Sequence, residues 1–94
     1  MQLDGHPVAL LVYLMPEIDD KVAVLLKVCP TGNNIHLPLN LQLVVLNESG
    51  EVFDQAEARS MDNCIQLQFT YEAGDSFCVK VALGDISHTE EFIS

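Results

Sequence analysis

The sequence predicts an all-β domain: a two-sheet antiparallel β-sandwich of about seven strands, immunoglobulin-like or fibronectin-like in kind. Large apolar side chains recur at every second position in four segments, residues 22–28, 37–45, 65–71 and 77–83. This period of two is typical of a strand with one face on a core and the other in water. Turn-forming residues separate the segments roughly every ten residues, and no segment sustains a helical period. A small Greek-key β-barrel is the alternative.

The first three strands are expected over residues 7–15, 21–29 and 37–45. The first has apolar residues on both parities, which suggests that a neighbouring segment or chain also covers its outer side. The second ends at a strong loop signal. The third ends before Asn47, and Gly50 is suited to the positive φ of a tight hairpin.

The other four strands are expected over residues 51–58, 63–71, 75–83 and 86–93. The first of them is weakly patterned, which favours an edge strand with a bulge. The next two are expected to form a hairpin around Gly74 that pairs Phe69 with Phe77. In that register Cys64 faces Ala82, so no disulfide is expected within the hairpin. The last is expected to be a short edge strand.

The composition fits one small domain with a real core. The chain has 94 residues, of which 49% are hydrophobic, so disorder is not expected. Fourteen acidic residues against four basic ones give a net charge of −10. A surface of this sign repels phosphate backbones and anionic headgroups, so neither nucleic acid nor a membrane is expected as a partner.

The cysteines and the longest apolar run bear on localisation. The chain has three cysteines, Cys29, Cys64 and Cys78. Because their number is odd and no CxxC spacing occurs, they are predicted to be free thiols in a reducing compartment. The apolar run at residues 8–15 is shorter than the roughly 20 residues that span a bilayer, and no basic segment precedes it. We therefore expect a cytoplasmic protein.

Acidic side chains are expected to gather at one end of the sandwich, because successive loops alternate between its two ends. These residues are Glu17, Asp19, Asp20, Glu48, Glu72 and Asp75. The main prediction is a solvated acidic rim with no metal. The alternative is that these loops bind calcium, which takes six to eight oxygen ligands, or a small ligand.

The opposite end of the sandwich is expected to hold Asn33, Asn34, His36, Asp62, Asn63 and Asp85. His36 with Asp62 or Asp85 is the one pair that resembles a general base or a metal ligand. His6 and His88 lie near the termini, and no nucleophile motif or phosphate loop is present. The prediction is therefore a non-enzymatic protein with no catalytic residue and no cofactor.

Apolar residues on outward parities suggest an interaction face. Leu25, Val44 and Leu46 are its predicted members, and Ala82, Leu11 and Tyr13 share the outward parity. Exposed apolar area usually marks an interface, so a protein partner is expected, and a homo-oligomer is one form of such docking. Edge strands offer a second route, by strand addition. The alternative is that central strands tolerate apolar residues on both faces.

Four segments resemble the C-terminal portion of an uncharacterised cyanobacterial family of unknown function. They are residues 41–53 (LQLVVLNESGEVF), 63–69 (NCIQLQF), 79–85 (VKVALGD) and 89–92 (TEEF). The resemblance covers residues 7–94 and implies a C-terminal domain behind a larger N-terminal region, which would then be a partner. It implies no activity or cofactor. Two positions depart from the family: Cys64 stands where a large residue such as Tyr is favoured, and Asp54 stands for an apolar residue.

Overall fold

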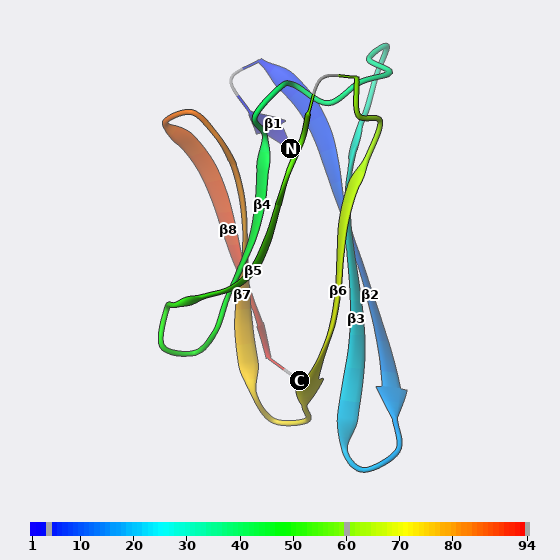
Figure 1. Cartoon of the computed structure of the whole chain (residues 1–94), viewed down its shortest axis with the longest axis vertical. Helices are drawn as coiled ribbons and strands as arrows, with labels where there is room; N and C mark the ends of the chain where they lie inside the picture. The colour runs from blue at the N-terminus through cyan, green and yellow to red at the C-terminus, as the bar shows by residue number, and fades with distance from the viewer. Residues whose placement is uncertain (4, 60, 94) are drawn as a thin grey trace.

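The alternating apolar residues form two antiparallel four-stranded sheets in the computed structural model, which describes residues 1–3, 5–59 and 61–93. The sheets face each other without closing into a barrel (Figure 1). The predicted β-sandwich is therefore confirmed, and the barrel alternative is wrong. The described part of the chain has no helix, and hence none long and apolar enough to cross a membrane.

The first sheet has the order β1-β2-β3-β6 and the second the order β5-β4-β7-β8. The strands of the first sheet are β1 (Gln2–Leu3), β2 (His6–Glu17), β3 (Lys21–Pro30) and β6 (Ile65–Glu72). Those of the second sheet are β4 (Gln42–Leu46), β5 (Val52–Glu57), β7 (Ser76–Leu83) and β8 (Ile86–Ile93). Each of the seven predicted segments contains a strand, and the short β1 is an addition.

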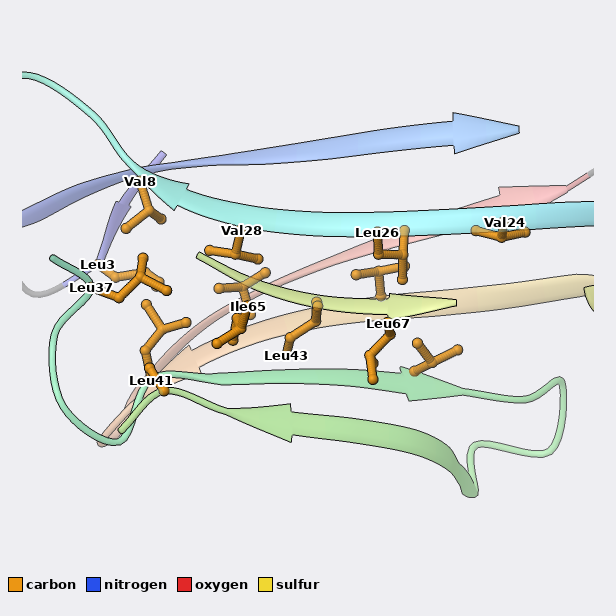
Figure 2. Close-up of a cluster of buried hydrophobic side chains, with 14 of the residues drawn as sticks. Leu3, Val8, Val24, Leu26, Val28, Leu37, Leu41, Leu43, Ile65 and Leu67 are labelled. Carbon is orange, nitrogen blue, oxygen red and sulfur yellow. The ribbon is translucent and has the colours of Figure 1, made fainter. Parts of the chain in front are cut away.

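The core consists of the side chains on the inner faces of both sheets (Figure 2). Its largest fully buried members are Leu3, Val8, Leu26, Val28, Leu41, Leu43, Val45, Val79 and Val81. No polar or charged residue is buried in the described part of the chain. The fold is therefore held by apolar burial, which contributes roughly 25 cal/mol per Å².

The third predicted strand is shorter than expected. Leu37 and Leu41 are buried as predicted, but Leu39 is 58% exposed and β4 begins only at Gln42. A turn interrupts the segment, since the Leu41 N–H donates to the Pro38 carbonyl oxygen and Asn40 has a φ of 69°. Proline has no N–H for a ladder, and asparagine tolerates the left-handed region, so this sequence favours a turn over a strand.

The predicted hairpin between the fifth and sixth segments is wrong. β6 pairs with β3, whereas β7 pairs with β4 and β8 in the other sheet. Phe69 and Phe77 do meet, but across the core, with ring centroids 5.3 Å apart and an edge-on geometry. Alternation reports which side chains point inward, and it is the same for two strands within one sheet and for two strands in facing sheets.

The prediction of three free thiols is also wrong, because Cys29 and Cys64 form a disulfide with Cα atoms 4.5 Å apart. Val28 lies opposite Ile65 in the β3–β6 ladder, so the next residues along, Cys29 and Cys64, are also opposite each other. This separation is typical of a non-hydrogen-bonded pair on antiparallel strands. Only Cys78 is free. The cysteines therefore give no support for a reducing compartment.

The predictions for β5 and for the turn before it are confirmed. β5 is an edge strand, and its register with β4 shifts between Val45 and Leu46. The shift leaves Phe53 without a counterpart in β4, and its ring contacts Phe69 in the other sheet at 5.4 Å. Gly50 has a φ of 83°, as a tight turn requires.

Candidate functional site

The acidic turns lie together at one end of the sandwich (Figure 1). The Ala73 N–H donates to the Asp20 carbonyl oxygen at 2.7 Å, and the Ser76 N–H donates to Glu48 Oε1 at 3.0 Å. Asp19 and Asp20 both have positive φ, so they serve the β2–β3 turn. Among the described residues, no three His, Cys, Asp or Glu side chains are close enough together to hold a metal ion.

A hollow of about 420 Å³ opens at the same end, and we call it the aromatic hollow. Residues from β4, β5, β6, β7 and their turns line it: Val45, Leu46, Asn47, Glu48, Ser49, Phe53, Phe69, Thr70, Tyr71, Glu72, Asp75, Ser76 and Phe77. The two strands of the mistaken hairpin thus contribute opposite walls of one cavity.

Four aromatic rings, together with Val45 and Leu46, form the apolar part of this hollow. Phe69 is central, with Phe53 and Phe77 edge-on to it at 5.4 and 5.3 Å, and Tyr71 packs on Phe77 at 4.9 Å. The Tyr71 hydroxyl is buried without a hydrogen-bond partner in the described part of the chain. A buried hydroxyl without a partner lowers the stability of a protein by about 1–3 kcal/mol. Among the described residues, the Tyr71 hydroxyl is the buried side-chain polar atom without a partner.

At the opposite end, the Leu37 N–H donates to the Asp62 carbonyl oxygen at 2.9 Å, so the backbone next to His36 lies against Asp62. The Asp62 carboxylate accepts the Arg59 N–H at 2.8 Å, which is a turn contact. His36 makes no hydrogen bond or ion pair with Asp62 or Asp85 among the described residues. Asp85 instead lines a shallow hollow that also contains His6.

The remaining polar residues there serve local structure. The Asn34 side-chain amide donates to the Thr31 carbonyl oxygen at 3.4 Å, within the predicted loop. His88 Nε2 lies 3.0 Å from the carbonyl oxygen of Gln2, so it links β8 to β1. Asn33 and Asn63 are exposed.

The three residues of the predicted interaction face are not neighbours. Leu25 lies opposite Gln68 and Tyr13 on the outer face of the first sheet, whereas Val44 and Leu46 lie on the outer face of the second. Val44 is only 7% exposed, because the side chains of neighbouring strands cover it. Leu46 lies opposite Val52, which is 58% exposed, and Leu25 lies opposite Tyr13 in a longer exposed apolar surface.

That surface is the C-terminal half of β2, residues 10–15, which we call the apolar edge. Its exposed members are Leu11, Tyr13, Leu14 and Met15, with exposed fractions of 38%, 49%, 46% and 65%. β1 pairs only with the start of β2, through His6 and Pro7. Beyond that point β2 borders β3 on one side and no described strand on the other.

The backbone of the apolar edge also has unpaired groups. Val8 donates its N–H to the Met1 carbonyl oxygen at 2.9 Å and accepts from the Met1 amino group at 2.7 Å, so both its polar groups point away from β3. Along a strand, the backbone N–H and C=O groups of successive residues point alternately to one side and to the other. The N–H and C=O groups of Leu10, Val12 and Leu14 therefore point the same way, toward the open side of β2. Leu11 and Tyr13 already stand out in the sequence as apolar residues on the outward parity, but the predicted interaction face consists of Leu25, Val44 and Leu46.

The fold and these two surfaces define a small antiparallel β-sandwich domain with one unprotected strand edge and one aromatic hollow. The chain belongs to the family described as Protein of unknown function (DUF1822), whose model matches residues 1–93. The predicted membership of a family of unknown function is thus confirmed. No curated protein and no solved structure matches the chain.

Proposed function

We propose that this domain is a non-enzymatic protein-interaction module that assembles with a second copy of itself through the apolar edge of β2. The observation that carries the proposal is the row of backbone groups at Leu10, Val12 and Leu14, which point away from β3. An edge strand with free N–H and C=O groups is a template for another strand.

Two of the other three sheet edges carry features that oppose strand addition. β5 is bulged and has Asp54 and Glu57, and β8 has Glu90 and Glu91. Bulges and charges are the usual protection of an edge. The third edge, β6, has no Asp, Glu, Lys or Arg in residues 65–71, as β2 has none in residues 6–16, but the outward side chains of β6 are polar whereas those of β2 are apolar. In a chain of net charge −10, β2 is therefore the uncharged edge whose exposed side chains also offer apolar contacts to a second copy.

A two-fold axis at Tyr13 gives a register that fits the strand. Tyr13 then meets the partner's Tyr13, Val12 meets the partner's Leu14, and Leu10 meets the partner's Pro16. Val12 and Leu14 exchange backbone hydrogen bonds, and the Leu10 N–H donates to the carbonyl oxygen of the partner's Pro16. Every pair from Leu10 to Pro16 is apolar on both faces, and apolar cross-strand pairs stabilise a sheet. The partner's strand ends before Val8, where Met1 already occupies the edge.

Sedimentation equilibrium of the 94-residue chain tests the proposal. We expect a monomer–dimer equilibrium between about 10 μM and about 1 mM, the range typical of a small interface. Tyr13→Lys should abolish the dimer, because it places two like charges opposite each other on the axis. Val52→Lys is the matched control, since Val52 is 58% exposed on the other sheet. A wild type that is monomeric throughout this range, or equal association of both variants, contradicts the proposal.

Three finer expectations accompany this proposal. The strand order supports an immunoglobulin-like topology, in which an added C′ strand extends the GFC sheet. The position of the domain behind a larger N-terminal region in cyanobacterial proteins stays a prediction, and such a region is the competing occupant of the β2 edge. Cytoplasmic localisation also stays a prediction, and the Cys29–Cys64 disulfide favours oxidising surroundings instead.

A further inference from the structure

We infer that the aromatic hollow binds an organic cation, that is, an alkylammonium or guanidinium group. This inference is independent of self-association, because the hollow is formed by β4, β5, β6 and β7 and contains no residue of β2. Two features of the hollow point to the same chemistry: its aromatic rings and its acidic rim.

The rings supply the walls that such a cation prefers. Phe53, Phe69, Tyr71 and Phe77 all line the hollow. Phe77 is only 4% exposed and stacks on Phe92 at 5.3 Å, so Phe53, Phe69 and Tyr71 are the rings that a ligand reaches. A cation within about 6 Å of a ring centroid gains roughly 0.5–2 kcal/mol. Phe53 is 55% exposed at the bulge of β5, a position in which its ring is available to a ligand.

The rim supplies the opposite charge. Glu48, Glu72 and Asp75 line the hollow, and its lining contains no Lys, Arg or His. The Ser76 N–H holds the Glu48 carboxylate at 3.0 Å and links two of the turns that form the rim. Carboxylates above aromatic walls attract a ligand that is positively charged and partly apolar.

Other ligand classes fit this lining less well. A calcium ion needs six to eight oxygen ligands, and the carboxylates of the described residues do not converge to that extent. An anion meets three carboxylates and no basic group. A neutral apolar molecule gains nothing from the rim.

Choline and its neutral isostere 3,3-dimethylbutan-1-ol provide the first test, because they share a shape and differ in charge. Chemical-shift titration in ¹⁵N- and ¹³C-labelled wild-type protein should show choline, at a Kd of the order of 1 mM, shifting the ring signals of Phe53, Phe69 and Tyr71. We expect the alcohol to bind roughly two- to thirty-fold more weakly. Equal binding of the two, or no shift with choline at about 50 mM, well above that Kd, overturns the inference.

Two matched pairs of variants locate the site. Phe53→Ala should weaken choline binding several-fold, while Val52→Ala, its exposed neighbour outside the lining, should not. Glu72→Gln should weaken it as well, while Glu57→Gln, which removes the same charge outside the hollow, should not. Equal effects within either pair would mean that the hollow is not the site.

The same chemistry reaches the hollow either as a small amine or as a side chain of another protein. Butylammonium, butylguanidinium and the peptides acetyl-Gly-Lys-Gly-amide and acetyl-Gly-Arg-Gly-amide distinguish these sources. Tighter binding of a peptide than of the matching amine assigns the hollow to a basic protein segment, and tighter binding of the amine assigns it to a small molecule. Both results support the inference, and binding of none of the four contradicts it. A dimer lost by Tyr13→Lys with choline binding retained would show that the two sites are separate.

Discussion

The disulfide between Cys29 and Cys64 makes a quantitative prediction about stability. It joins residues 35 apart in sequence, and the loop-closure entropy for such a loop is about 13 cal/mol/K, or about 4 kcal/mol at 25 °C. A small domain has a total stability of about 5–15 kcal/mol. Reduction should therefore remove a large share of the free energy of unfolding. Cys64 is exposed and Cys29 half-buried, so a reductant reaches the bond in the folded protein.

Urea denaturation with and without a phosphine reductant measures this effect. With an m-value of about 1–3 kcal/mol/M, the midpoint should fall by about 2 M. Cys29→Ser with Cys64→Ser should have the low midpoint in both conditions, and Cys78→Ser, the control, should behave as wild type because Cys78 is free. The denatured, unreduced protein should titrate one thiol. Three titratable thiols, or a midpoint that the reductant leaves unchanged, would refute the reasoning.

Three further predictions follow from the fold. Leu43→Ala removes a fully buried side chain and should lower the free energy of unfolding by about 2–5 kcal/mol. Leu39→Ala, at a 58% exposed position, should change that free energy by less than about 0.5 kcal/mol. Similar urea midpoints for the two variants would argue against the turn before β4. Gly50→Ala should lower the free energy of unfolding by about 1–2 kcal/mol, because Gly50 has a φ of 83°, which alanine adopts only with strain. An unchanged Tm in thermal melts would argue against the turn between β4 and β5. Leu14→Pro removes an N–H that points away from β3, so it should keep the circular dichroism spectrum of a β-sheet and lose the dimer in sedimentation; a dimer that persists would exclude this edge.

The sequence predicts the central strands well because burial imposes a period of two on β3, β6 and most of β7. Leu26, Leu43, Leu67 and Val79 all lie on the predicted inward parity and all are buried. Leu39 departs because Pro38 and Asn40 form a turn that apolar alternation does not reveal. Local turn chemistry thus prevails over pattern at that position.

Strand pairing was harder to predict because alternation contains no information about neighbours. A hairpin of β6 with β7 satisfies every inward residue equally well, and so does the observed arrangement in two sheets. Because the pairing of β6 was wrong, the disulfide was missed as well: only the β3–β6 ladder places Cys64 opposite Cys29. The mistaken pairing of β6 with β7 also prevented prediction of the aromatic hollow, because its rings come from strands in the two facing sheets.

The candidate surfaces were predicted in part. The common location of the acidic turns followed from loop alternation, and three of the six predicted carboxylates, Glu48, Glu72 and Asp75, line the hollow. The sequence indicates Leu11 and Tyr13 as outward-facing apolar residues, but it does not show that β2 is an open edge, because which strand is an edge depends on strand order. The apolar residues on both parities of β2 were the available signal.

Residue-resolved amide exchange of the 94-residue chain at two concentrations tests the proposed assembly most directly. In dilute protein the amides of Leu10, Val12 and Leu14 should exchange fast, while those of Leu11 and Tyr13, which point toward β3, stay protected. In concentrated protein the first three should become protected as well. Equal exchange of Leu10, Val12 and Leu14 at both concentrations, in a sample that sediments as a dimer, would place the interface elsewhere and contradict the account.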